Sequence, residues 1–118
     1  MVQIKICDRT FRFSLLIIKL YKHLNIKHEY ILSKQLLKSG TSIGANVEEA
    51  QAAQSRNDFI SKMSIASKEA RESKYWIRLL NHSGYLINFE AKEELLSEIN
   101  NIVNIITKIV KSTKEKEY

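Results

Sequence analysis

The fold of this chain is decided by one stretch of small residues, Ser39-Gly40-Thr41-Ser42-Ile43-Gly44-Ala45-Asn46-Val47-Glu48-Glu49-Ala50-Gln51-Ala52-Ala53. It holds two of the chain's three glycines, and strong helix formers follow them. A glycine in a helix interior costs roughly 1 kcal/mol relative to alanine. Apolar residues nevertheless continue at helical spacing through the stretch. The pattern predicts either a kinked helix or a helix that breaks and restarts, and we favour a continuous helix kinked near Gly40–Asn46.

The spacing Gly40-x-x-x-Gly44 does not fit a phosphate-binding loop. Such a loop has one more spacer residue and then Lys-Ser or Lys-Thr to hold the phosphates. Within a helix, two glycines four residues apart instead allow a neighbouring backbone to approach closely. We therefore predict that this stretch packs against neighbouring helices and does not bind a ligand. The residues expected to face those helices are Ser39, Gly40, Ser42 and Gly44.

Apolar periodicity predicts helices in the rest of the chain. The clearest signal is a heptad seam of apolar and small residues: Phe59, Met63, Ala66, Ala70, Ser73, Ile77 and Leu80. A second seam follows the same rule: Leu95, Ile99, Ile102, Ile106 and Ile109. The pattern predicts four helices, at about residues 8–25, 29–54, 56–82 and 89–113, and a charged C-terminal tail at 111–118.

Local signals mark several of the helix ends. Asp8 and Asn88 are candidate N-caps, and Ser55 with Asp58 has the spacing of a reciprocal cap. Gly84 is the candidate C-cap. The absence of proline and the few glycines favour helices with few connections. Helices joined by short links pack as antiparallel neighbours, so the 118 residues are predicted to form one all-α domain, an antiparallel up-and-down four-helix bundle.

Composition narrows the classes of partner. The formal net charge is +6, and residues 1–38 hold eight Lys and Arg against two acidic residues, so this third carries the whole surplus. Such a distribution favours a polyanion partner.

The lone Cys7 suits a small buried or edge residue in a reducing compartment. Apolar runs are too short to span a bilayer and no signal-peptide pattern is present, so we expect a cytoplasmic location and no membrane partner.

The predicted first helix carries both charge and apolar surface. At 100° per residue its cations fall within about 140° of arc. They form a candidate nucleic-acid-binding face: Lys5, Arg9, Arg12, Lys19, Lys22 and Lys27. Two interpretations fit this face, solvation alone or contact with a polyanion. Apolar residues occupy most of the circumference, so we expect the helix to contact another copy in a homo-oligomer as well as its own subunit.

Aromatic residues do not follow the basic face. Phe11, Phe13 and Tyr21 mostly point away from the cations, which favours recognition by charge and shape over base stacking. Trp76, beside Tyr75, is interpreted as a core or interface anchor.

No constellation of residues points to catalysis or to a metal. A di-iron bundle needs Glu-x-x-His on two helices. That motif is absent around the glutamates at Glu48, Glu49, Glu69 and Glu72. No metal-ligand spacing relates the histidines His23, His28 and His82. The sequence therefore predicts a protein that is not an enzyme and that uses no metal or cofactor.

Several segments together carry a family resemblance: Leu37–Ala50, Ser55–Ile60, Ala66–Ala70, Tyr75–Leu80 and Ser83–Leu86. Their combination, within about residues 11–110, resembles the bacterial four-helix-bundle proteins often called 23S rRNA intervening-sequence proteins. Many members have Ser-Ile-Pro-Ser-Asn where this chain has Ser42-Ile43-Gly44-Ala45-Asn46.

The resemblance implies a small cytoplasmic bundle whose subunits form a ring-like homo-oligomer, a pentamer. A related branch, the accessory variability determinants of diversity-generating retroelements, binds nucleic acid and a reverse transcriptase through a basic surface. The family brings no catalytic residues. The leading hypothesis is a non-enzymatic bundle that binds RNA or another nucleic acid as a homo-oligomer. The alternative is a protein–protein interaction scaffold that binds no nucleic acid.

Overall fold

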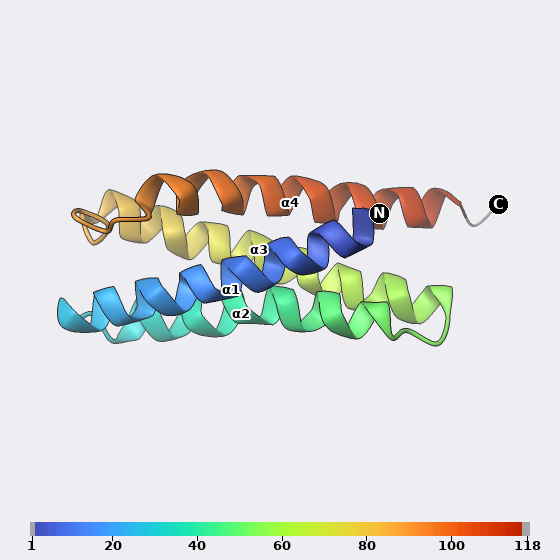
Figure 1. Ribbon diagram of the computed structural model, residues 1–118, viewed down its shortest axis with the longest axis horizontal. Helices are drawn as coiled ribbons and strands as arrows, with labels where there is room; N and C mark the ends of the chain where they lie inside the picture. The colour runs from blue at the N-terminus through green and yellow to red at the C-terminus, as the bar shows by residue number, and fades with distance from the viewer. Residues whose placement is uncertain (1, 117–118) are drawn as a thin grey trace.

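Four helices account for most of the chain. The computed structural model describes the backbone of residues 2–116 and the side chains of residues 6–116. The helices are α1 (Val2–Ile26), α2 (Ile31–Gln51), α3 (Arg56–His82) and α4 (Lys92–Glu115). Consecutive helices pack side by side in opposite directions, and α1 also packs against α4, which closes a bundle of 50 × 20 × 20 Å (Figure 1). The predicted all-α antiparallel bundle is confirmed.

The order of the helices around the bundle places α1 and α3 at opposite corners. In the described part of the chain, no Cα atom of α1 lies within 8 Å of a Cα atom of α3. Figure 1 shows α1 slanting from beside α2 at its C-terminal end toward α4 at its N-terminal end. The outward faces of α1 and α3 therefore point in different directions.

Two helix starts and the C-terminal tail differ from the sequence prediction. The cap at Asp8 is wrong, because α1 begins at Val2 and the buried Ile6 extends its packed face past Asp8. The cap at Asn88 is also wrong. Asn88 has φ 66°, in the left-handed region, and α4 begins only at Lys92. That helix continues through most of the predicted tail to Glu115, while residues 117–118 lie outside the described residues.

The end of α3 and the start of the same helix confirm two predicted caps. Gly84 has φ 84°, and the Tyr85 N–H donates to the carbonyl of Leu80 at 3.0 Å, as in a Schellman motif. At the other end, the Ser55 hydroxyl accepts from the Asp58 N–H at 3.0 Å, while the Asp58 carboxylate accepts from the Gln54 N–H at 3.3 Å in place of the reciprocal bond from Ser55. These local signals act as the sequence predicts because each involves residues within one turn.

All but the last two residues of the small-residue stretch lie within α2, which runs unbroken from Ile31 to Gln51. A Cβ added at Gly40 would lie 2.8 Å from Cγ1 of Ile17 on α1. A Cβ at Gly44 would lie 3.2 Å from the carbonyl oxygen of Thr10, also on α1. The two glycines therefore let α1 approach α2 closely, as predicted.

Ser39 performs the corresponding role toward α3. Its buried hydroxyl accepts a hydrogen bond from the Ser73 hydroxyl at 2.9 Å. Ser42 is half-buried, and its inward orientation stays a prediction. The Asn46 side chain donates to the Ser42 carbonyl within the helix and caps nothing, so the break-and-restart alternative is wrong. The kink near Gly40–Asn46 stays a prediction.

None of the described helices is both long enough and apolar enough to cross a membrane.

Candidate nucleic-acid interface

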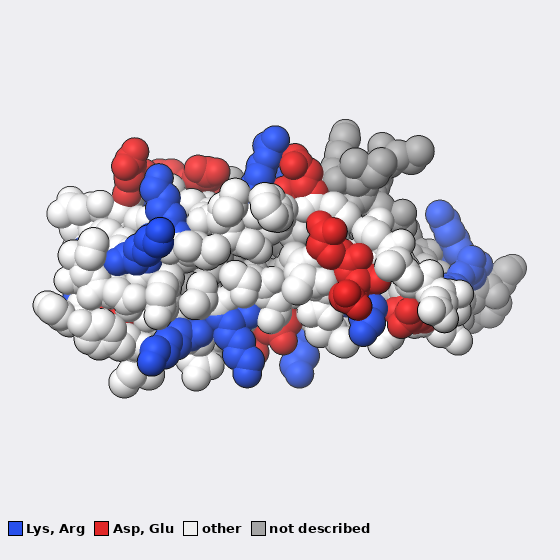
Figure 2. All heavy atoms as spheres, turned by 60° about the horizontal axis from the view of Figure 1, so that its bottom comes forward, with Lys and Arg blue, Asp and Glu red and all other residues white. Residues whose placement is uncertain are grey.

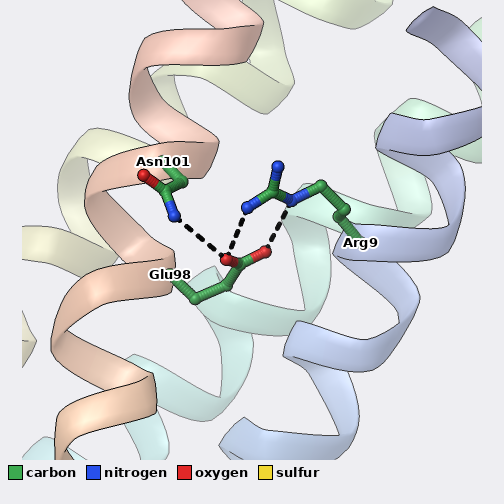
Figure 3. Close-up of polar contacts among 3 residues, drawn as sticks. All are labelled: Arg9, Glu98 and Asn101. Atoms are coloured by element: carbon green, nitrogen blue, oxygen red, sulfur yellow. Dashed lines mark hydrogen bonds and ion pairs between the residues drawn. The ribbon is translucent and has the colours of Figure 1, made fainter.

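Arg9, one of the six predicted binding residues, is committed to a contact between α1 and α4. Its Nε and Nη2 donate to the two carboxylate oxygens of Glu98, at 2.8 Å and 2.7 Å (Figure 3). Asn101 also donates to Glu98, at 3.4 Å. The hydrogen bond from Arg9 lowers the pKa of the Glu98 carboxyl, and the same bond raises the pKa of Arg9. The pair joins two helices and neutralises most of the charge that Arg9 would offer a ligand.

Two further residues of the predicted face also have partners within the chain. Arg12 forms an exposed ion pair with Asp8 one turn earlier, at 3.2 Å. Lys27 donates to the carbonyl oxygen of Ile87 at 2.7 Å and so links the end of α1 to the α3–α4 connection. Exposed pairs of this kind are weak, and a phosphate can displace them at small cost. The side chain of Lys5 lies outside the described residues.

Lys19 and Lys22 are the freest cations of the predicted face. Both are exposed, and neither takes part in the ion pairs found among the described side chains. Figure 2 shows that Lys and Arg side chains on one side of the bundle stand in separate groups with uncharged surface between them. The first helix therefore offers two exposed cations outside the described ion pairs, Lys19 and Lys22, and not a continuous basic face.

The outermost part of α1 is apolar. Phe11, Leu15 and Ile18 follow one another at helical spacing and are 59%, 54% and 39% exposed. We call these three residues the α1 stripe. Lys19 and Lys22 lie beside or at the end of this stripe, so the same face of α1 carries both apolar surface and charge.

A second basic surface, which the sequence reasoning missed, runs along α3. Five exposed residues recur at intervals of three and four: Lys68, Arg71, Tyr75, Arg78 and His82. We call them the α3 stripe. The face-by-face count used for the first helix would have found them, because the signal is purely local spacing.

The two neighbouring aromatic residues of α3 lie in different environments. Trp76 packs against the core and donates through Nε1 to Glu72 at 3.2 Å, so the predicted anchor is confirmed. Tyr75 is 52% exposed and its ring lies edge-on to Trp76, with centroids 5.3 Å apart. One ring therefore anchors the helix, and the other remains on the surface.

A groove of 380 Å³ lies between α1 and α4, lined by Asp8, Arg9, Arg12, Phe13, Leu16, Glu94 and Glu98. Its charges are of both signs, and Arg9 and Glu98 already satisfy each other. Among the described side chains, no three His, Cys, Asp or Glu residues come together as metal ligands. Burial, and secondly the charge of Glu48, raises the pKa of the half-buried Cys7 thiol, which disfavours the reactive thiolate.

Comparison with known proteins places the chain in a family. Residues 2–108 match the family described as 23S rRNA-intervening sequence protein. A crystal structure of a protein with unknown function from the S23 ribosomal protein family of Bacteroides thetaiotaomicron is similar, with 43% sequence identity and a TM-score of 0.87. The similarity covers 94% of this chain and 99% of that protein. No curated protein matches the sequence. Because the match spans nearly the whole chain, the protein belongs to the 23S rRNA-intervening sequence protein family.

Proposed function

We propose that the protein is a non-enzymatic RNA-binding bundle that acts as a homo-oligomer in the cytoplasm. The observation that carries the proposal is the exposure of Lys19 and Lys22, which form no ion pair with any described side chain, in the third of the chain that holds the whole net positive charge. Unpaired surface ammonium groups bind phosphates by releasing counterions. The family description, which refers to an intervening sequence of 23S rRNA, favours RNA as the polyanion.

The α1 stripe supports the homo-oligomer. Phe11, Leu15 and Ile18 form a contiguous apolar line that the subunit itself leaves uncovered. Exposed apolar lines of this kind are typical of contact surfaces. Family resemblance suggests a pentamer. In a ring, several weak cation pairs would act on one RNA together, and effective concentration would raise the overall affinity.

Filter binding to a structured RNA across a salt series tests the RNA proposal. We expect affinity to fall steeply with salt, and Lys19→Glu with Lys22→Glu to weaken binding at least tenfold at low salt. Lys34→Glu with Lys38→Glu is the matched control, because both residues are exposed on α2 and the charge change is the same. No binding at low salt, or equal loss in both double variants, would contradict the proposal.

Light scattering at micromolar concentration tests the homo-oligomer. We expect Ile18→Glu to dissociate the assembly, because it places a carboxylate in the proposed apolar contact. The control is Ile65→Glu on α3, since Ile65 is 40% exposed against 39% for Ile18. A monomeric wild-type protein, or two variants of unchanged mass, would rule out assembly through this face.

A protein–protein scaffold is the second candidate function. It is favoured by the mixture on α1, where apolar residues lie beside Lys19 and Lys22. An acidic amphipathic helix of a partner protein would match such a face. A pull-down from the native host that recovers one protein, with RNA absent after nuclease treatment, would support this candidate over RNA binding.

A further inference from the structure

We propose that the α3 stripe is a binding surface for single-stranded RNA, with Lys68, Arg71 and Arg78 on the phosphates and Tyr75 stacked on a base. This inference rests on the proposed RNA-binding function. It adds a second RNA contact, on a different helix from the one that carries Lys19 and Lys22.

The charge pattern of α3 is the first argument. At 100° per residue the α3 stripe occupies a sector of about 80° that contains no acidic residue of the helix. The acidic residues of α3 lie together outside that sector, at Asp58, Glu69 and Glu72. Neither ion pair among the described side chains involves α3. Among the described side chains, the cations of the stripe therefore form no ion pair.

The exposure of Tyr75 is the second argument, and it selects single strands. The ring is 52% exposed and has Arg71 one turn before it and Arg78 one turn after it. Exposed aromatic rings between cations bind single-stranded nucleic acid, because unpaired bases stack on the ring while the cations follow the backbone. The bases of a duplex are already stacked and cannot use the ring.

The geometry of the stripe is the third argument. Its five residues form a nearly straight line, and the rise of 1.5 Å per residue from Lys68 to His82 gives a length of about 21 Å. That length accommodates a short single-stranded segment. A helix held by packing on its opposite face keeps the line straight. The buried face of α3 provides that support through Ala66, Ala70, Ser73 and Ile77.

The position of α3 makes the surface compatible with assembly. Since α1 and α3 occupy opposite corners, a ring contact between the α1 stripe of one copy and the α2 or α4 side of the next would leave the α3 stripe exposed. Lys19 and Lys22 lie at the edge of that contact, whereas the α3 cations do not. A ring would thus display one stripe per subunit to the same RNA.

Fluorescence anisotropy with two labelled RNAs of equal length, an oligouridine strand and a duplex, tests the proposal on the full chain. Arg71→Glu with Arg78→Glu should weaken oligouridine binding at least tenfold, and should reduce the slope of log affinity against log salt by about 1.4. Tyr75→Leu should weaken oligouridine binding about tenfold and leave duplex binding unchanged, whereas Tyr75→Phe should retain both. Lys34→Glu with Lys38→Glu again controls for charge.

Trp76 supplies an intrinsic second readout, because it is the only tryptophan of the chain. A base that stacks on Tyr75 lies close to the indole, whose centroid is 5.3 Å from the Tyr75 ring. Saturating oligouridine should change the Trp76 emission of the wild-type and Tyr75→Phe proteins but not of Tyr75→Leu.

The outcomes separate this inference from the proposed function. Binding that is lost with Lys19→Glu and Lys22→Glu but unaffected by the α3 substitutions overturns the inference and leaves the proposed function standing. An equal loss of strand and duplex binding in Arg71→Glu with Arg78→Glu, and no effect of Tyr75→Leu, overturns the single-strand assignment. If neither RNA binds at low salt, both proposals fail.

Discussion

The helices α1 and α3 stand at opposite corners of one bundle and bury residues of opposite size. The inward face of α1 carries large side chains such as Phe13 and Leu20, whereas the inward face of α3 is built largely from Ala66, Ala70 and Ser73. Large residues fill the core, and small residues let neighbouring helices approach. The outward faces differ as well, because α1 exposes the apolar α1 stripe together with cations, whereas α3 exposes cations around the ring of Tyr75. One corner therefore supplies large core side chains and an exposed apolar stripe, and the other supplies close packing and a line of cations around an exposed ring.

The largest predicted effect is removal of core volume from α1. Phe13 is 1% exposed, and Phe13→Ala should lower the free energy of unfolding by about 4 kcal/mol, from lost burial and the cavity left behind. Urea unfolding followed by circular dichroism measures the change. Ile26→Ala is the control on the same helix, since Ile26 is 79% exposed, lies outside the α1 stripe and should cost well under 1 kcal/mol. Similar costs at the two positions would contradict the assignment of the inward face.

The second largest effect is expected when a larger side chain is added to the inward face of α3. Ala70 is fully buried, so Ala70→Leu has to displace packed neighbours and should cost about 2 kcal/mol. The exposed Ala45 on α2 is the control, because Ala45→Leu adds the same atoms without overpacking and should change stability by less than about 0.5 kcal/mol. Thermal unfolding of both variants measures the difference. A tolerated Ala70→Leu would show that the small residues of α3 are not required for close packing.

A smaller effect is expected where α2 approaches α1. Gly40→Ala gains about 1 kcal/mol of helix propensity, but its Cβ would lie 2.8 Å from Ile17 Cγ1. Moving Ile17 should cost about 2 kcal/mol, so the net loss is about 1 kcal/mol. In an Ile17→Ala background the same substitution should become stabilising. Urea unfolding of the four proteins of this cycle measures the coupling, and additive effects would show that the two residues do not interact.

The bundle architecture, the close helix approach at the α2 glycines and most local signals were predictable from sequence, whereas two helix starts and a specific contact between helices were not. The seams of α3 and α4, the Ser55 cap and the Gly84 turn depend on residues within one or two turns. The start of α1 was missed because tertiary packing of Ile6 determines it, and no cap signal marks it.

The candidate site was likewise only partly predictable from the sequence. A count of faces on one helix assigns Arg9 to a basic surface, but its partner Glu98 is 89 residues away in sequence. Only the packing of α1 on α4 brings the two together. Tyr75 and its flanking arginines could have been found from spacing, but their exposure and the orientation of Trp76 required the structure.

The smallest predicted effect concerns the ion pair between Arg9 and Glu98, which makes Arg9 less available to a ligand than the cations of α3. Glu98→Gln should lower the free energy of unfolding by about 0.5 kcal/mol at pH 7, a small value because Arg9 is partly exposed and solvent screens the pair. Glu94→Gln is the matched control, since Glu94 is exposed one turn earlier on α4 and has no ion-pair partner among the described residues.

The pH dependence of that difference follows from the pKa of Glu98. The hydrogen bond from Arg9 lowers this pKa in the folded protein, so the unfolded chain takes up the proton first as the pH falls. The stabilisation is therefore complete above the unfolded pKa of about 4.3 and is lost as the pH drops through the lower folded value. Urea unfolding of the wild-type and Glu98→Gln proteins should show a constant difference from pH 8 to 5 that shrinks below about pH 4.3. A difference that persists unchanged at pH 2 would mean that it does not come from the charge of Glu98.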